Sequence, residues 1–360
     1  MNYFPNGDEE VSLVKFIAKY QYLRVSDAEY FFKTNKYYKN RIKSLIDKKI
    51  LRRIKWNLVL GDFGIEYVKQ LNFKYNRLNR NKKYMERLIR ISNFAAYYHN
   101  SNTVEFIPSF EIKDKKCLTI TGRRFIGILK VNGYSYLTYY ISEKNDNKYI
   151  ASVIYDIQKD FTYGNVIVLV NDINRIKFDE FATGHNSALI IEDNEENREK
   201  LKYLHRVNWS KIVNNYFDES LAISAYNFCD YTDYKSKYVS YFQFLDIEKM
   251  WRIKMFLREN GNGKYKTATI ICGKEIENIL RKEIPNAKYI VIDLEKHIDK
   301  YKRVKSLGFL SIACKSSNCF FNPLWKKVLL LKATAYANCI ISCPAKNLTL
   351  VKSSTPNILA

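Results

Sequence analysis

Residues 9–71 constrain the fold more than any other part of the chain, because four patterns follow one another there in a set order. An apolar stripe predicts a helix over about Glu9–Tyr20. A short second helix, a basic third helix and a hairpin rich in Arg and Lys follow it. This order predicts a winged helix-turn-helix, a fold that presents one helix to a groove of DNA.

Capping signals mark the starts of the second and third helices. Ser26 and Glu29 have the spacing of a capping box, in which the Ser side chain accepts from the amide three residues on and the Glu side chain reaches back. After a polar break, either Thr34 or Asn35 is expected to cap a third helix over about Lys36–Lys49.

The third helix has an apolar side and a polar side. Apolar positions at i, i+4, i+7 and i+8 are expected to face inward, and they are Tyr38, Ile42, Leu45 and Ile46. Candidate DNA-contacting residues lie on the opposite side and its margins, and they are Lys36, Tyr37, Lys39, Asn40, Arg41, Lys43 and Ser44. Cationic side chains contact phosphates and Asn pairs with an adenine edge, so this side is the expected reader. The alternative is an ordinary solvated helix in a Lys-rich chain.

A short hairpin is expected to form the wing. Ile50–Lys55 and Leu58–Leu60 are predicted strands, with a turn at Trp56-Asn57 between them. Three basic side chains would then lie along the phosphate backbone, and they are Arg52, Arg53 and Lys55. A further helix, Ile65–Leu71, is expected to close the module after Gly61–Gly64.

The charge distribution favours a polyanionic partner. The 360-residue chain has a formal net charge of +23, and Lys33–Arg90 holds eighteen Lys or Arg against four acids. Release of counterions makes such binding favourable and salt-dependent, so double-stranded DNA is the expected partner. A Lys-rich composition also arises from an AT-rich genome, which is the alternative explanation for the total charge but accounts less well for its concentration near the N-terminus.

Other function classes lack their signals. The first ten residues have no cationic segment followed by an apolar run, and no stretch reaches the roughly 20 apolar residues of a membrane span. The seven cysteines and four histidines show no metal-site spacing, and Gly261–Lys264 lacks the pattern of a phosphate-binding loop. We therefore expect a cytoplasmic protein that binds no membrane, metal or other cofactor.

The remainder of the chain alternates strand and helix patterns, which favours a mixed or parallel sheet and an α+β or α/β class. We expect four parts: a winged helix-turn-helix in 1–72, a basic linker helix in 73–100, an α/β domain in 101–215 and a second α/β unit in 216–360. The basic segment Lys74–Tyr98 would extend the basic surface, form a homodimer contact or pack on the next domain.

Two stretches after residue 100 look like two passes through one α/β unit, YLTYYISEKND…VIVLVND and YVSYFQFLDIE…ATIICGKE. Asn132-Gly133 is a hairpin signal between the first two strands that lead into the first stretch. The expected strands are Leu118–Ile120, Phe125–Val131, Tyr134–Ile141, Val166–Val170, Ala188–Ile191, Tyr238–Phe244, Ala268–Cys272 and Tyr289–Asp293. The expected helices are Asn147–Lys159, Ile247–Glu259 and Lys274–Glu283.

The N-terminal module resembles the winged helix of the plasmid replication-relaxation family in three runs, VKFIAKYQYLRVSDAEYFF, YKNRIKSLIDKKILRR and LVLGDFGIEYVKQL. Tyr22–Ser26 matches the family's turn, Arg41–Leu45 its reader helix and Gly61–Gly64 its exit. The resemblance covers the first fifth of the chain and, more loosely, the next third. It implies a sequence-specific DNA-binding protein of a plasmid or other mobile element, acting in replication initiation, mobilisation or their regulation. A winged-helix transcriptional regulator is an alternative.

Members of this family often continue with a domain similar to restriction nucleases. Such a site needs an Asp at a strand end and an acid-x-Lys on the next strand, because Mg²⁺ requires convergent carboxylates. Here Gly127 stands near the Asp position. The next strand carries Tyr139, Tyr140 and Ser142 in place of the acid-x-Lys pattern, and Glu143-Lys144 lies at its end. We expect no catalytic residue, although three acids are available nearby, Glu105, Glu111 and Asp156. A metal-dependent nuclease or nickase directed by the winged helix is the enzymatic alternative.

Overall fold

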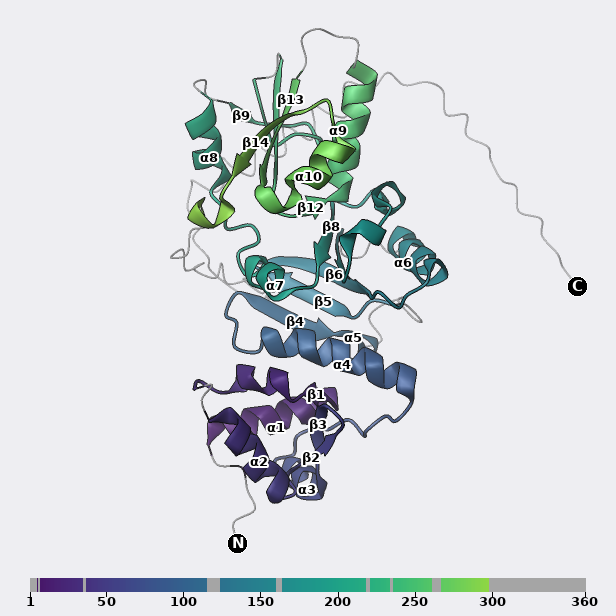
Figure 1. Ribbon diagram of the computed structural model, residues 1–360, viewed down its shortest axis with the longest axis vertical. Helices are drawn as coiled ribbons and strands as arrows, with labels where there is room; N and C mark the ends of the chain where they lie inside the picture. The colour runs from purple at the N-terminus through teal and green to yellow at the C-terminus, as the bar shows by residue number, and fades with distance from the viewer. Residues whose placement is uncertain are drawn as a thin grey trace, which may run out of the picture. The chain divides into compact units, whose positions relative to one another are not determined.

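Three β-sheets and the helices packed on them organise the described residues (Figure 1). The computed structural model describes residues 5, 7–34, 37–114, 124–159, 164–217, 221–233, 236–260 and 267–297. The expected strand Leu118–Ile120, the segment Gly261–Lys264 and residues Asn35 and Lys36 lie outside these ranges. The fold is mixed α/β, in agreement with the expected class.

The N-terminal elements enclose a small three-stranded antiparallel sheet with the order β1-β3-β2. In chain order they are α1 (Asp8–Tyr20), β1 (Leu23–Arg24), the 3₁₀ helix η1 (Ser26–Phe31), α2 (Tyr38–Asp47), β2 (Leu51–Ile54), β3 (Asn57–Leu60) and α3 (Asp62–Gln70). Their apolar sides meet in a core that includes Leu13, Ile17, Leu23, Ala28, Ile42, Leu45 and Leu58.

The helix starts differ from the prediction. The capping box does not form, because the Ser26 hydroxyl donates to Asp27 Oδ1 at 2.9 Å and the segment is a 3₁₀ helix without a side-chain cap. The N-cap position of α2 belongs to Tyr37 rather than to Thr34 or Asn35. The hairpin turn lies at Lys55-Trp56, one residue earlier than predicted, since Asn57 pairs with Ile54 in the sheet.

The basic segment after α3 is helical only in its second half. Helix α4 (Lys82–Tyr97) begins where Asn81 Oδ1 accepts from the Tyr84 amide, so the predicted start at Lys74 is wrong. Residues 73–81 lie against the C-terminal end of α1 instead, where the Asn76 amide donates to Ala18 O at 2.9 Å. A backbone that is hydrogen-bonded to another element does not need helical bonds of its own.

The six-stranded sheet has the order β12-β8-β7-β6-β5-β4. Strands β4 to β6 are antiparallel neighbours, whereas β6, β7 and β8 are parallel. Its elements are β4 (Val104–Pro108), α5 (Ser109–Asp114), β5 (Gly127–Val131), β6 (Tyr134–Ile141), α6 (Asn147–Lys159), β7 (Asn165–Val170), η2 (Ile173–Arg175), η3 (Phe178–Phe181), β8 (Ser187–Glu192), α7 (Glu195–Leu201) and β12 (Leu245–Asp246). The Asn132-Gly133 hairpin is confirmed, with φ of 48° and 89° at its two turn residues.

The five-stranded sheet has the order β14-β13-β11-β10-β9. Its elements are α8 (Trp209–Tyr216), β9 (Ala222–Ile223), β10 (Tyr231–Thr232), β11 (Lys237–Phe242), α9 (Ile247–Asn260), β13 (Thr267–Gly273), α10 (Lys274–Glu283), β14 (Lys288–Ile292) and η4 (Leu294–His297). Strands β9 to β11 are antiparallel neighbours, and β11, β13 and β14 are parallel.

Both larger sheets repeat one plan. Each contains an antiparallel three-stranded meander, a crossover helix to a parallel strand and a second parallel strand at the next position. Helix α4 precedes the first meander and α8 precedes the second. A shared plan of this kind is expected of two related α/β units.

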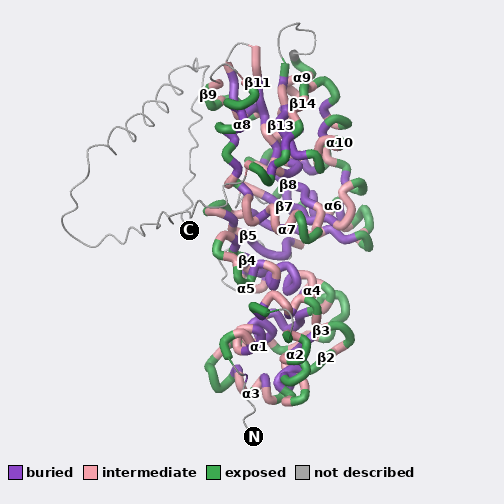
Figure 2. Tube along the Cα trace, turned by 60° about the vertical axis from the view of Figure 1, so that its left-hand side comes forward, coloured by how far each residue is buried: buried purple, intermediate pink, exposed green. Residues whose placement is uncertain are grey.

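Buried strands and helix faces fill the interior of the described part (Figure 2). One apolar cluster extends from α1 through α4 to one face of the six-stranded sheet. A second cluster joins the other face of that sheet to α6, α9 and α10. Within the described ranges, no helix combines the length and apolar character needed to cross a membrane.

Candidate nucleic-acid interface

Helix α2 is held from one side. Ile42 and Leu45 are buried in the N-terminal core, which confirms their predicted inward direction. Tyr38 and Ile46 are partly buried and pack against the same core from its edge. The orientation of this helix is therefore set by apolar burial on a single stripe.

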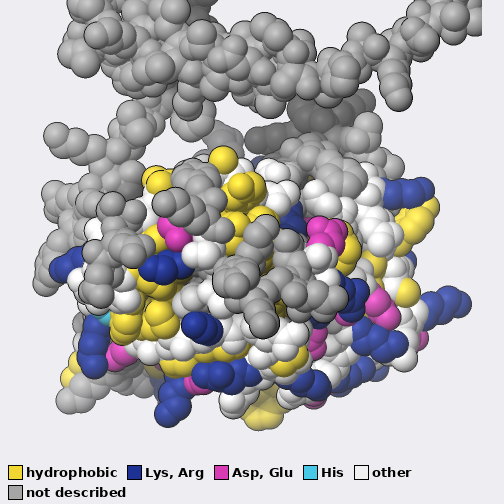
Figure 3. All heavy atoms as spheres, turned by 90° about the horizontal axis from the view of Figure 1, so that it is seen from above, with side chains coloured by type: hydrophobic (Ala, Val, Ile, Leu, Met, Phe, Trp, Pro, Cys, Tyr) yellow, Lys and Arg dark blue, Asp and Glu magenta, His cyan; other side chains and the backbone are white. Residues whose placement is uncertain are grey.

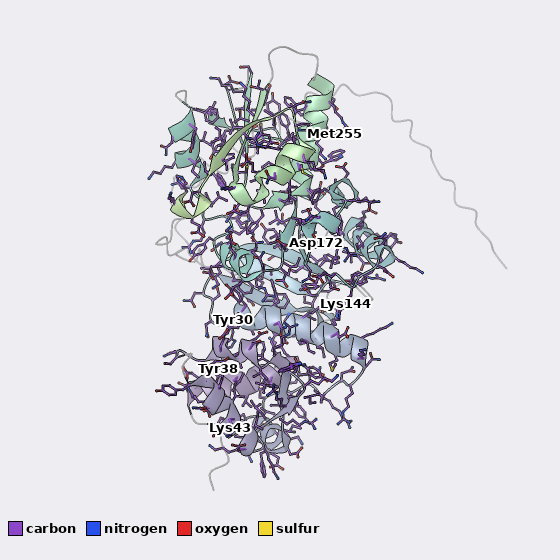
Figure 4. All side chains as sticks on the ribbon, viewed as in Figure 1. Tyr30, Tyr38, Lys43, Lys144, Asp172 and Met255 are labelled. Carbon is purple, nitrogen blue, oxygen red and sulfur yellow. The ribbon has the colours of Figure 1, made fainter. Side chains whose placement is uncertain are left out.

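The opposite side of α2 is open to solvent. Its exposed residues are Tyr37, Lys39, Asn40, Lys43, Ser44 and, at the end of the helix, Asp47. Tyr37 at the start of the helix has 56% of its surface exposed. Figure 4 labels Tyr38 at the start of α2 and Lys43 further along it. The side therefore carries lysines, an amide and a hydroxyl, which are the kinds of group that can contact phosphates and base edges.

Arg41 does not belong to this open side, which corrects the sequence prediction. Its Nε donates to Glu10 Oε1 at 3.0 Å, its Nη1 pairs with Glu9, and its guanidinium lies 4.7 Å from the centroid of the Phe32 ring. Only 32% of its side chain is exposed. Position 41 adjoins Ile42 at the margin of the apolar stripe, where the acids that begin α1 reach it. The adjacent pair of acids, Glu9 and Glu10, was the signal that sequence reasoning missed.

Arg41 should therefore contribute to stability. Replacing it with Ala removes the guanidinium partner of Glu9 and Glu10 and the stacking on Phe32, so we expect the free energy of unfolding to fall by about 1–3 kcal/mol. Denaturant unfolding of the full chain measures this, with Lys39→Ala on the open side of the same helix as the matched control, expected within about 0.5 kcal/mol of wild type.

The effect of Arg41→Ala should shrink in acid. The pKa of Glu9 is lowered by the hydrogen bond from the Lys33 amide and, next, by Arg41. A carboxyl whose pKa is lowered by folding stabilises the protein at pH values above its ordinary pKa. That stabilisation is lost as the pH falls through the lowered pKa. Equal stability of Arg41→Ala and Lys39→Ala at neutral pH would contradict a structural role for Arg41.

The β2–β3 hairpin carries the predicted wing residues, and all three are exposed: Arg52, Arg53 and Lys55. Lys55 takes the turn position with φ of 55°, and its carbonyl accepts from Arg53 Nε at 2.8 Å. The Trp56 carbonyl accepts from the Val25 amide at 3.0 Å, which ties the tip to the start of η1. The tip is thus braced by hydrogen bonds on both sides.

Trp56 is the feature of the β2–β3 hairpin that sequence reasoning left out of the site. It is 74% exposed, and the Arg53 guanidinium lies 5.3 Å from its ring centroid. An aromatic residue at a turn between two basic strands was the available signal. A planar side chain beside a guanidinium can stack on a sugar or base next to a phosphate contact.

The acids considered for a nuclease-like site lie apart. Gly127 begins β5 and pairs with Thr138, Tyr139 is buried, Tyr140 is partly buried, and Glu143 and Lys144 follow β6 in an exposed turn. Glu105 pairs with Lys130 at 3.0 Å, Glu111 with Lys19 at 2.7 Å and Asp156 with Arg124 at 3.5 Å. Within the described ranges, no group of three or more potential ligands could hold a metal ion.

Many cations after residue 170 are already paired. Lys200 contacts Glu196 and Glu275, and Lys254 contacts Asp179 and Glu283. The described side chains visible in Figure 3 likewise mix Lys and Arg with Asp, Glu and hydrophobic residues. Lys200 and Lys254 therefore differ from the exposed lysines of α2, since each is held between two carboxylates.

Comparison with models of protein families, with curated proteins and with solved structures found no match to this chain.

Proposed function

We propose that the N-terminal elements form a winged helix that binds double-stranded DNA, with α2 in the major groove and the β2–β3 hairpin along the phosphate backbone. The orientation of α2 carries this proposal, because Ile42 and Leu45 fix one side in the core while Asn40, Lys43 and Ser44 face solvent. A helix of about 10 Å diameter fits the major groove when one such side is free.

The residues have separate tasks in this proposal. Asn40 and Ser44 lie one turn apart on the open side and read base edges, whereas Lys39 and Lys43 contact phosphates. Arg41 is a positioning residue, since its pairing with the acids of α1 adds to the apolar burial that orients α2.

The cellular role rests on the resemblance of the N-terminal runs to the replication-relaxation family. We assign the chain to a plasmid or other mobile element, where it acts in the cytoplasm on replication initiation, mobilisation or their regulation. A transcriptional regulator would use the same contacts. A homodimer would place two copies of α2 on two half-sites about one helical turn apart.

Selection from a pool of random-sequence duplexes, followed by affinity measurements on a selected and a scrambled duplex, tests this function. Asn40→Ala with Ser44→Ala is expected to lower the ratio of the two affinities by roughly 10- to 100-fold, because a base contact is worth about 1–3 kcal/mol of discrimination. Binding to the scrambled duplex should change little, since the phosphate contacts remain.

Asn215→Ala, an exposed change on α8, is the matched control and should leave the ratio unchanged. An unchanged ratio in the Asn40/Ser44 variant would rule out α2 as the reader.

A further inference from the structure

A groove of about 770 Å³ is lined by residues 75–80, which have no regular secondary structure, and by residues of α1, β2, β3 and α3. The segment 73–81 is bound to the C-terminal end of α1 and to the residues that follow it. Asn76 Nδ2 donates to Lys19 O at 2.6 Å, the Asn79 amide donates to Gln21 Oε1 at 2.8 Å, and Tyr22 donates through its hydroxyl to Asn79 O at 2.7 Å. These bonds hold an irregular segment in one conformation.

The lining of this groove has one sign of charge. Three arginines line it, Arg52 from β2 and Arg77 and Arg80 from the extended segment, and all three are exposed. Its other lining residues are uncharged, so no carboxylate of the described part of the chain lines the groove. Among the described residues, none of the three arginines forms an ion pair, in contrast to Arg41, Arg198 and Arg281.

Arg52 and Arg80 also share a neighbourhood. Burial raises the pKa of Tyr22, and the charges of Arg80 and Arg52 oppose that rise from nearby. Like charges held close together without counter-charges repel one another, and a bound polyanion relieves this repulsion. Guanidinium groups are suited to phosphate because their planar fork donates two parallel hydrogen bonds.

We infer that this groove is a second binding site for the DNA phosphate backbone, formed by Arg52 together with Arg77 and Arg80, which lengthens the contact made by the wing. The inference rests on the proposed function, because it takes the same duplex as ligand. The hydrogen bonds of the segment fix the backbone that carries both arginines, so the conformational entropy lost when phosphates bind is mainly that of the two side chains.

The test is Arg77→Gln with Arg80→Gln in the full chain, titrated against the selected and scrambled duplexes at several salt concentrations. Affinity for both duplexes should fall by about 10-fold near 0.1 M salt, and the slope of log affinity against log salt should become shallower by about 2, since each lost phosphate contact removes about 0.9. The ratio of the two affinities should stay as in wild type, and hydroxyl-radical protection of the selected duplex should become shorter.

The charge-matched control is Arg258→Gln with Lys282→Gln, two exposed positions on α9 and α10. Wild-type affinity, slope and footprint in the Arg77/Arg80 variant would overturn the inference and leave the proposed function intact. A loss equal to that of the control would also overturn it, since only net charge would matter. Absence of duplex binding by the wild-type chain would overturn both proposals.

Discussion

Replacing Arg52 and Arg53 with Gln is expected to lower affinity for every duplex sequence by roughly 10- to 100-fold near 0.1 M salt. Both side chains are exposed on the hairpin, and the carbonyl of Lys55 holds Arg53 beside Trp56. Each lost hydrogen bond from an exposed side chain to a phosphate is worth about 0.7–1.4 kcal/mol, and 1.4 kcal/mol is a factor of ten. The salt slope should become shallower by about 2, while discrimination between sequences is retained.

The control for the wing variant changes the same net charge elsewhere. Lys282→Gln with Lys288→Gln alters two exposed positions on α10 and β14. If the proposal holds, this pair changes affinity far less than the wing pair does. Equal losses in the two variants would favour the alternative in which basic composition alone retains DNA weakly and without regard to sequence.

Glu248→Ala is expected to lower the free energy of unfolding by about 3–5 kcal/mol. Glu248 is 1% exposed, and its Oε1 accepts from the amides of Thr183 at 2.6 Å, Gly184 at 2.8 Å and His185 at 3.1 Å. Its other oxygen lies 4.0 Å from Arg252. Alanine would remove the buried acceptor of these three amides and the carboxylate beside Arg252, which would keep its hydrogen bond to the His185 carbonyl.

This carboxylate connects the two larger sheets. Glu248 belongs to α9, the crossover helix of the five-stranded sheet, whereas residues 183–185 lead into β8 of the six-stranded sheet. Denaturant unfolding compares Glu248→Ala with Glu259→Ala, an exposed change near the end of the same helix. A difference below about 1 kcal/mol between the two would show that the buried acceptor is not needed.

The sequence predicted the elements best where local patterning and burial agree. Helices α6 and α10 have the predicted bounds because their apolar residues recur at helical spacing, and strand β6 has them because an apolar, aromatic run starts directly after Asn132-Gly133. The Asn132-Gly133 turn followed from its preference for positive φ. These signals are contained within a few neighbouring residues, so no knowledge of the fold was required.

Predictions failed where distant residues decide the structure. Arg41 is drawn off the open side of α2 by acids more than thirty residues earlier, and Lys74–Asn81 is extended because the end of α1 supplies its hydrogen-bond partners. The groove lined by Arg77 and Arg80 follows from that second failure, since a continuous helix would not have placed them beside Arg52. The Glu248 site was likewise missed, because its donors are backbone amides more than sixty residues away.

Dimethyl sulfate interference on the selected duplex tests most directly whether α2 occupies the major groove. Guanine N7 faces the major groove and adenine N3 the minor groove, so methylation reports on each separately. We expect methylation of guanine N7 within the contacted stretch to block binding by the wild-type chain. At one or more of these positions, methylation should no longer affect binding by the Asn40→Ala/Ser44→Ala variant. Binding that tolerates N7 methylation at every guanine of the selected duplex would contradict the proposed role of α2.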